Sequence, residues 1–460
     1  MIPRSERNIL RPDVLTVLQH VDANADQIVS LCTDLVRTCS INPRYPNIDA
    51  PKVKGGESRC NEILGDCYRR LGCAVDFFEG APGRHNVVGV LQGTGGGRSL
   101  ILNGHVDTVP FTEPEKWPQS NPFSGIVVNG RIYGRGSCDM KAGLVAQVMA
   151  AKAIVDSNVK LKGNLILESV IGEEWMEHEI GTTAVIERGY HADAAIIAEP
   201  SAPPTPLAVV PATSGMIWMS LTCLGIPAHF SIRNEVIRAG CGKEVGVHAI
   251  DKGITLLKAL QDLERHWTIT KTHPLFQPGH FTIYPGAISA GPRGTPVPFQ
   301  LAGYCTIEYA IWYPPDQEPS AIQKEIEDYI FRASQVDPWL RENPPEIKWN
   351  MNWPATSINS DHPLVHAMLA AHESVSQKRA SVRDRNIQGF CAVCDASFLN
   401  NANIPSIVYG PGSLHQAHSE CEFVTIDEVI TATKALAVAA MDWCGVSEQE
   451  SQSKTGGMQT

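Results

Sequence analysis

The stretch that decides the fold is Leu100-Ile101-Leu102-Asn103-Gly104-His105-Val106-Asp107. Its apolar run predicts a buried strand that stops at Gly104, so His105 lies at the end of a rigid element. In an extended chain, side chains two residues apart point to the same face, and Asp107 is therefore expected to orient the His105 ring. This pair alone is a weak indication of a metal site.

Composition narrows the class of protein. The chain has 460 residues, 43% of them hydrophobic and 19% charged, which is typical of a globular protein large enough for two domains. Its net charge of -11 argues against nucleic acid as a partner, since no dense Lys/Arg stripe is present to neutralise phosphates. Residues 1–8 lack the apolar core of a signal peptide and no stretch is long and apolar enough to span a bilayer, so we expect a cytoplasmic protein without membrane contact.

The distribution of cysteines agrees with the expected cytoplasmic location. The 13 cysteines are scattered through apolar segments, which is typical of reduced core residues rather than of a disulfide framework. Cys391 and Cys394 form one isolated CxxC pair, and without a second pair nearby it is weak evidence for zinc or redox chemistry.

Strand-like and helix-like segments alternate over the first 200 residues. Buried-strand patterns lie at 86–91, 99–103, 164–171 and 194–198, and apolar residues at helical spacing lie at 24–38, 57–71 and 143–155. The alternation predicts an α/β domain with a mixed, mainly parallel sheet covered by helices. The glycine run at 93–97 is expected to form a hairpin turn between its flanking strands.

The pattern changes between about 208 and 355. Strands near 216–224, 281–283 and 302–309 and helices near 247–263 and 320–334 make a compact α+β set. We therefore predict a smaller domain, 208–355, inserted between the two parts of the catalytic domain, 1–207 and 356–460. Thr425-Ile426-Asp427-Glu428 has the form of a capping box and predicts the start of the last helix.

Further groups with oxygen or nitrogen donors follow predicted strands or glycine-rich loops. They are Asp139, Glu173, Glu174, Glu199 and His418. Each has an ordinary explanation as well: Asp139 suits a helix N-cap, Glu173-Glu174 a solvated turn, and His418 an exposed loop. Ligands collect at the carboxyl ends of strands in open α/β sheets, so a common position favours a common site. Such a crowd of carboxylates is stable only if divalent metal or protons neutralise it.

With these motifs the chain resembles the M20 family of metallopeptidases and deacylases, which includes acetylornithine deacetylases, succinyl-diaminopimelate desuccinylases and glutamate carboxypeptidases. The resemblance covers nearly the whole chain, including the inserted domain. It implies that His105 and Glu199 bind one metal ion, that Glu174 and His418 bind the other, and that Asp139 bridges them. Two divalent ions, zinc by default and manganese or cobalt as alternatives, would activate a water. Glu173 then matches the general base.

The resemblance also reaches the inserted domain. Gly225-Ile226-Pro227-Ala228-His229 is similar to the family segment whose histidine crosses a dimer interface to the partner's substrate carbonyl. It implies that His229 stabilises the oxyanion and that the protein is a homodimer through the inserted domain, which would also act as a lid. A polar residue at a strand end is the alternative explanation for His229.

The positions that hold substrate depart from the family pattern. Many relatives have an arginine before Gly-Ser, where this chain has Ala212-Thr213-Ser214-Gly215. The family's Asp-x-Arg appears here as Tyr309-Ala310-Ile311, and its asparagine as Thr295. Arg233 and Arg293 could replace this carboxylate clamp. The segment 234–247, with Trp312 and Phe390, favours a substrate larger or more aromatic than acetylornithine.

The leading hypothesis is an enzyme that hydrolyses the amide bond of an N-acyl amino acid or dipeptide-like small molecule. One alternative is an aminohydrolase that releases ammonia from an aromatic substrate with the same metals. A non-catalytic metal or peptide binder and a hydrolase with Cys138 or Cys391 as nucleophile are the other classes to separate.

Overall fold

A computed structural model describes residues 10–46, 48–49, 53–237, 245–292, 297–376 and 386–447. The chain divides into two compact units. The first comprises the described residues of Met1–Pro211, Ile358–Ile387 and Phe398–Thr460, and the second those of Ala212–Ser357 and Gln388–Ser397. Each unit has its own hydrophobic core.

The first unit is built on a mixed sheet with strand order β1-β2-β6-β3-β7-β15. The strands are β1 (Ala74–Ala81), β2 (Arg84–Leu91), β3 (Leu100–His105), β6 (Leu165–Val170), β7 (Ala195–Ile197) and β15 (Ser406–Val408). Neighbours among β6, β3, β7 and β15 are parallel, while β1 and β2 run antiparallel at one side. The predicted mixed sheet is confirmed, with parallel strands at its centre.

The glycine run at 93–97 does not make a hairpin, so that prediction is wrong. β6 lies between β2 and β3, and the hairpin of this region is instead β1-β2. Two of the glycines instead let other backbone segments pass close to this loop. A Cβ at Gly93 would lie 2.4 Å from the Lys162 carbonyl oxygen, and a Cβ at Gly97 would lie 2.1 Å from the Cys444 carbonyl oxygen. Local pattern could not show which strand would intervene.

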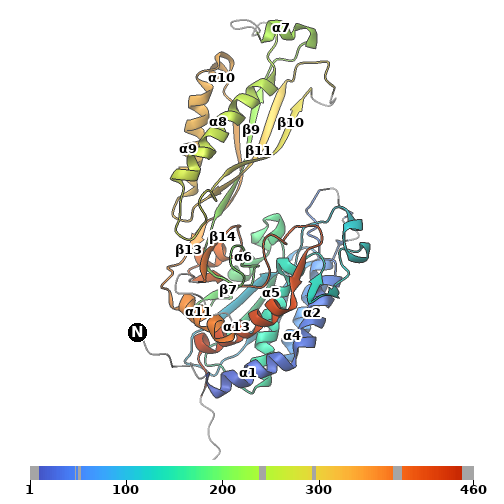
Figure 1. The fold of residues 1–460 in the computed structure, drawn as a ribbon, viewed down its shortest axis with the longest axis vertical. Coiled ribbons are helices and arrows are strands. Elements are labelled where there is room, and N and C mark those ends of the chain that lie inside the picture. The colour runs from blue at the N-terminus through green and yellow to red at the C-terminus, as the bar shows by residue number, and fades with distance from the viewer. Residues whose placement is uncertain are drawn as a thin grey trace, which may run out of the picture. The chain divides into compact units, whose positions relative to one another are not determined.

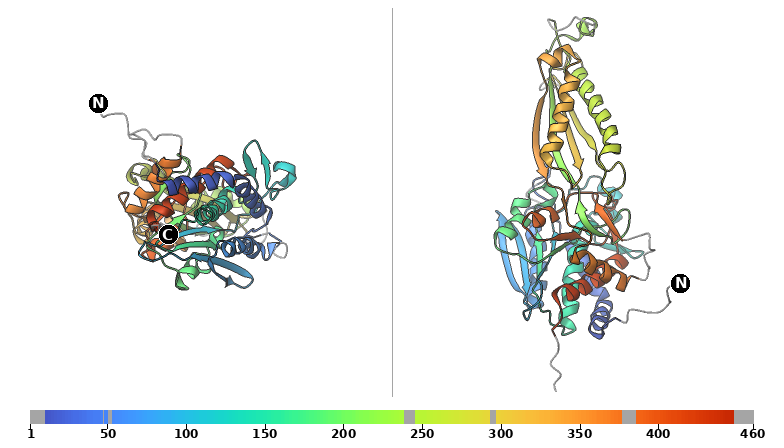
Figure 2. Two further views of the ribbon diagram at one scale, coloured as in Figure 1. Left: turned by 90° about the horizontal axis from the view of Figure 1, so that it is seen from below. Right: turned by 90° about the vertical axis from the view of Figure 1, so that its left-hand side faces the viewer.

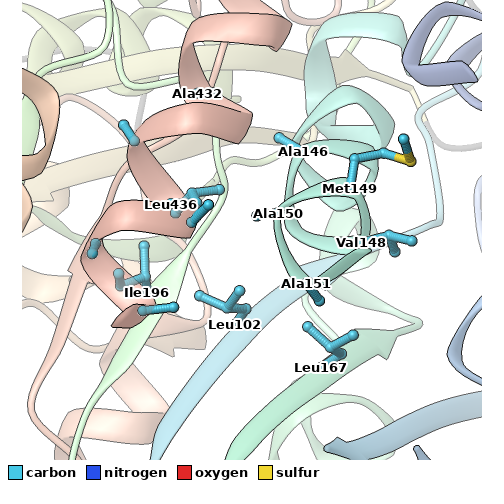
Figure 3. Close-up of a cluster of buried hydrophobic side chains, with 14 of the residues drawn as sticks. Leu102, Ala146, Val148, Met149, Ala150, Ala151, Leu167, Ile196, Ala432 and Leu436 are labelled. Atoms are coloured by element: carbon cyan, nitrogen blue, oxygen red, sulfur yellow. The ribbon is translucent and has the colours of Figure 1, made fainter. Parts of the chain in front are cut away.

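Helices cover the sheet of the first unit. They are α1 (Pro12–Ala23), α2 (Ala25–Arg37), α4 (Gly56–Arg70), α5 (Ala142–Asp156), α6 (Thr182–Glu187), α11 (Pro363–Val375), α12 (Ala396–Asn401) and α13 (Ile426–Cys444). The helices α5 and α13 lie side by side (Figure 1). Their side chains form one buried cluster with sheet residues such as Leu102 (Figure 3). The neighbouring Asn103 donates to Thr182 of α6, which places α6 on the opposite face.

Small residues let α5 and α13 pack closely. Figure 3 shows Ala146 and Ala150 of α5 near Ala432 and Leu436 of α13, all of them buried. The predicted cap of α13 is confirmed, because Thr425 Oγ1 accepts from the Glu428 N–H at 3.3 Å.

The first unit also contains a three-stranded sheet. Its order is β16-β5-β4, with β4 (Ile126–Val128), β5 (Arg131–Tyr133) and β16 (Phe423–Thr425). β16 pairs antiparallel with β5, with Phe423 opposite Tyr133. The strand β8 (Val209–Thr213) pairs antiparallel with β15 of the main sheet, with Val210 opposite Val408.

The second unit is an antiparallel sheet with helices on one face, which confirms the predicted separate α+β part. The order is β10-β11-β9-β12, from β9 (Gly215–Leu224), β10 (Ile283–Gly291), β11 (Tyr304–Tyr313) and β12 (Glu346–Trp353). Alternate residues of β9 and β11 are buried in one core with side chains of α8 (Ala249–Thr270) and α9 (Pro319–Ser334). The two helices lie along one face of the sheet (Figure 2). Shorter elements are α7 (Arg233–Val236), α10 (Pro338–Glu342), β13 (Thr356–Ser357) and β14 (Ile387–Phe390).

The second unit runs from Ala212 to Ser357, against the predicted 208–355, and includes one further segment. Residues 388–397, expected in the second part of the catalytic domain, belong to the second unit. The Trp353 indole N–H donates to the Cys394 carbonyl at 3.1 Å, and the Ser397 hydroxyl donates to the Pro354 carbonyl at 2.6 Å. Among the described residues, no helix combines the length and apolar character needed to cross a membrane.

Candidate metal centre

The candidate site lies at the carboxyl edge of the parallel strands. His105 ends β3, Glu173 and Glu174 follow β6, and Glu199 follows β7. His418 lies in the loop after β15. Because β6, β3, β7 and β15 are parallel neighbours, their carboxyl ends meet at one edge of the sheet. The fold therefore brings together residues that are more than 300 positions apart.

Asp139 stands between the two histidines. Its Oδ1 lies 3.2 Å from His105 Nε2, and its Oδ2 lies 3.4 Å from His418 Nε2. Glu199 Oε1 lies 3.2 Å from His105 Nε2, and Glu174 Oε2 lies 3.0 Å from His418 Nε2. The donors thus form two sets that share Asp139.

Glu173 faces the first of these sets. Its Oε2 lies 3.7 Å from His105 Nε2, and its side chain is 10% exposed. His105, Glu173 and Glu199 offer ligand atoms within 4.8 Å of one another, as do His105, Asp139 and Glu174. The turn begins at Gly172 with φ 88°, a conformation that favours glycine and lets the chain reverse directly after β6.

Asp139 is not a helix cap. It lies in the irregular turn Ser137–Lys141 that precedes α5, and α5 has no side-chain cap. Both of its carboxylate oxygens point to histidines instead. Glu173 and Glu174, each 8% exposed, are likewise not a solvated turn.

Asp107 has a different set of contacts from the one expected. The His105 ring bonds through Nδ1 to the backbone carbonyl of Asp107 at 3.0 Å, whereas the Asp107 carboxylate is 3.6 Å away. That carboxylate accepts from Glu174 N–H at 3.1 Å and from Asn42 Nδ2 at 2.8 Å. Asp107 therefore fixes the His105 ring by its main chain and the Glu174 turn by its side chain.

Burial and charge shift the pKa values in the site. Burial raises the pKa of Glu199 to about 8, with a further contribution from Asp139. The Glu174 carboxylate raises the pKa of His418 to about 11, and burial raises that of Glu174. Burial opposes ionisation of Asp139, but its interactions with His105 and His418 outweigh this and lower its pKa. The pocket therefore needs positive charge.

The donor set fits divalent metal. With Nδ1 of His105 directed at a carbonyl, its buried Nε2 has no hydrogen-bond partner of good geometry and faces carboxylate oxygens. A neutral imidazole would present its lone pair to those oxygens, an arrangement that a cation between them relieves. Mixed imidazole and carboxylate donors suit zinc, manganese or cobalt.

Two of the substrate-binding residues predicted in the inserted domain, His229 and Arg233, are described and belong to the second unit. His229 is exposed, and its Nδ1 lies 2.8 Å from Ser231 Oγ. Arg233 makes a bidentate pair with Asp251, so a substrate carboxylate would have to displace that residue. Arg293 lies outside the described residues.

Several residues around the site could not be predicted from the sequence. The Tyr45 hydroxyl donates to the Glu174 carbonyl at 2.9 Å, and Asn42 binds Asp107. Glu422 accepts from the N–H groups of Cys138 and Asp139 at 2.8 and 3.1 Å. The one available hint was that Glu422 is acidic and follows His418 closely.

The cysteine-nucleophile alternative loses its support. Burial raises the pKa of Cys138 far above its ordinary value, and that of Cys391 is also raised by burial. A thiol must ionise to act as a nucleophile, and burial opposes ionisation of both thiols.

Comparison with known proteins defines the class. The family described as Peptidase family M20/M25/M40 matches residues 101–442. This range holds every predicted metal ligand and the whole second unit. The chain belongs to this family of metal-dependent hydrolases that act on C–N bonds.

Individual relatives support the same assignment. The chain is 34% identical over 441 residues to N-formyl-4-amino-5-aminomethyl-2-methylpyrimidine deformylase of Halalkalibacterium halodurans, covering 93% of this chain and 97% of the relative. It is 28% identical over 411 residues to acetylornithine deacetylase of Vibrio cholerae, covering 89% and 97%. Among solved structures, human carnosine dipeptidase 1 superposes with a TM-score of 0.70 at 16% identity, covering 94% and 99% of the two chains, which shows the shared fold.

Proposed function

We propose that the protein hydrolyses the amide of an N-acylated, most specifically N-formylated, amine carried on an aromatic ring. The observation that carries the hydrolytic part is the pair of donor sets that share Asp139. The aromatic amine replaces the N-acyl amino acid as the leading substrate class for two reasons. The 34% relative is a deformylase named for an aminopyrimidine, and the expected carboxylate clamp is absent.

The proposed metal ligands follow the geometry. His105 and Glu199 would hold one ion, Glu174 and His418 the other, and Asp139 both. Zinc is the default, with manganese and cobalt as alternatives. When bound, two such ions supply an activated water and polarise the scissile carbonyl.

Glu173 would be the proton carrier. Its carboxylate lies beside the ligand set, with Oε2 3.7 Å from His105 Nε2, in a buried turn that the bond from the Glu174 N–H to Asp107 fixes. It would take a proton from the attacking water and deliver it to the leaving nitrogen. The overall reaction is then formamide plus water to amine plus formate.

We further propose a homodimer formed through the second unit, with His229 of one chain acting in the site of the other. The support is the similarity of Gly225-Ile226-Pro227-Ala228-His229 to the family segment, together with the exposure of His229.

The test is a substrate panel with metal-reconstituted protein. The proposal expects formate release from an N-formyl aminomethylpyrimidine to exceed acetate release from N-acetylornithine and cleavage of dipeptides. Ammonia release in place of formate would support the aminohydrolase alternative, and no turnover of any substrate would support a pure binder.

Glu173→Gln is expected to lower kcat by about 100-fold or more while leaving metal content unchanged, because only the proton carrier is lost. Glu179→Gln is the matched control, since this nearby side chain is 68% exposed and lies outside both donor sets. Equal activity of Glu173→Gln and the control would refute the assigned role.

A further inference from the structure

A buried carboxylate that the proposed mechanism does not use lies beneath the Asp139 turn. Glu422 is 0% exposed, and its Oε1 accepts from the backbone N–H of Cys138 at 2.8 Å and of Asp139 at 3.1 Å. Two main-chain donors of the turn thus converge on one oxygen. The position of the Asp139 main chain depends on this contact.

Arg135 completes the arrangement. Its Nη1 binds Glu422 Oε2 at 2.7 Å, and its Nη2 reaches the backbone carbonyl of His418 at 3.4 Å. Arg135 is 3% exposed, so the pair is shielded from water. Glu422 and Arg135 together therefore touch the main chain of both Asp139 and His418.

The register of the small sheet fixes the pair in place. Phe423 of β16 lies opposite Tyr133 of β5, and the Gly134 N–H donates to the Glu422 carbonyl at 3.0 Å. This bond extends the ladder by one step, directly below the turn that carries Asp139. The sheet thereby couples the loop before α5 to the loop before α13.

Charge explains why an ion pair is used here. The site already holds the carboxylates of Asp107, Asp139, Glu173, Glu174 and Glu199. Another unpaired carboxylate would add to their repulsion, but the guanidinium of Arg135 neutralises Glu422. Glu422 can therefore accept from the turn without competing as a metal ligand.

We propose that Glu422 and Arg135 are positioning residues that set the separation and orientation of Asp139 and His418. The inference rests on the proposed function, in which Asp139 and His418 are metal ligands. Partners of this kind affect metal affinity by about 10- to 100-fold in other sites.

The test uses Glu422→Gln and Arg135→Lys. Glu422→Gln keeps the shape but turns an amide towards Arg135, whereas Arg135→Lys keeps the charge and loses the fork that reaches His418. We expect zinc affinity, measured by competition with a chelating dye, to fall about 10- to 100-fold in Glu422→Gln and less in Arg135→Lys. The visible absorption of the cobalt(II) form should change in both.

Glu57→Gln is the control for loss of a buried ion pair. Glu57 binds Arg84 through both oxygens at 2.6 and 2.7 Å, and among the described residues neither member bonds to a proposed ligand. This variant should lower thermal stability while zinc affinity and the cobalt spectrum stay at wild-type values.

Two outcomes separate the inference from the metal assignment. Asp139→Asn and His418→Ala should each weaken zinc binding, and wild-type affinity in both would overturn the ligand assignment itself. If they weaken binding while Glu422→Gln and Arg135→Lys behave like Glu57→Gln, the pair is merely structural and the inference is wrong.

Discussion

At the scale of single residues, the two carboxylate oxygens of Asp139 face different histidines. Oδ1 faces His105 and Oδ2 faces His418, each within 3.4 Å. A carboxylate placed this way can be shared by two cations, whereas the amide of an asparagine would offer only one such oxygen. The division of the site into two halves thus depends on one side chain.

The shifted pKa values predict that metal binding releases protons. Without metal, Glu199 with a pKa of about 8 and His418 with a pKa of about 11 hold protons at pH 7. Both must lose them to become ligands, so protons compete with metal. Metal affinity should therefore rise as pH increases from 6 towards 8, the direction in which Glu199 ionises.

Calorimetric titration of zinc at pH 7 in buffers with different ionisation enthalpies checks this. Because metal binding is expected to release protons to the buffer, the observed heat should vary with the ionisation enthalpy of the buffer. Heats that are independent of buffer, with an affinity that is flat between pH 6 and 8, would contradict the shifted pKa values.

Residue types at strand ends indicated the site, but not how each residue is held. His105, Glu174 and Glu199 could be proposed from the sequence because an apolar run leads to each. The carboxylate of Asp107 was expected to orient His105, yet its main-chain carbonyl makes that bond. Glu422 could not be foreseen, because its contacts span 283 or more residues and arise from strand pairing.

At the scale of elements, α5 approaches β7 at a glycine. A Cβ on Gly143 would lie 2.0 Å from the carbonyl oxygen of Ala198, the residue before Glu199. Gly143→Ala gains about 1 kcal/mol in helix propensity but forces backbone apart, at a cost of about 1–3 kcal/mol or more. We expect a lower Tm and weaker zinc binding, because Glu199 is displaced.

Gly65→Ala is the matched control within a helix. There the nearest atom, Val87 Cγ2, is at 3.3 Å and belongs to a side chain that can shift. Thermal melting should show this variant to be neutral or stabilised. If Gly143→Ala melts like Gly65→Ala with unchanged zinc affinity, the α5–β7 contact does not position Glu199.

Long periodic segments were the predictable elements. The helices expected at 24–38 and 57–71 correspond to α2 and α4, and the strand at 99–103 to β3. β4, β5 and β16 have three residues each, too few for a periodic signal, and their pairing depends on contacts far along the chain. The hairpin prediction at 93–97 failed for the related reason that β6 enters between sequential strands.

At the scale of the whole molecule, the two units have separate cores, and every proposed metal ligand belongs to the first. Metal that binds only the folded first unit stabilises it by about 2.7 kcal/mol at a concentration of 100 Kd. With an unfolding entropy of about 2.1 cal/mol/K per residue, this corresponds to roughly 4–5 °C for a unit of about 300 residues. Chelation should therefore lower the melting transition of the first unit and leave that of the second.

Differential scanning calorimetry with and without chelator checks this prediction. Asp139→Asn should abolish the metal-dependent shift. An equal shift of all transitions in both wild type and Asp139→Asn would place the metal effect outside the proposed site.

The inserted part could be located from the sequence because its pattern of strands and helices differs from that of the α/β part. The second segment of this unit, which comes later in the chain, could not be located from the sequence. Residues 388–397 carry no distinguishing pattern, and they join the second unit through single hydrogen bonds such as that from Trp353 to Cys394.

The most direct test of the central claim, that the shared carboxylate of Asp139 marks a two-metal centre, is anomalous diffraction from zinc-loaded crystals. We expect two peaks, one within coordinating reach of His105 Nε2 and Glu199 and the other within reach of His418 Nε2 and Glu174, with Asp139 in reach of both. Zinc bound elsewhere, with these carboxylates uncoordinated, would contradict it.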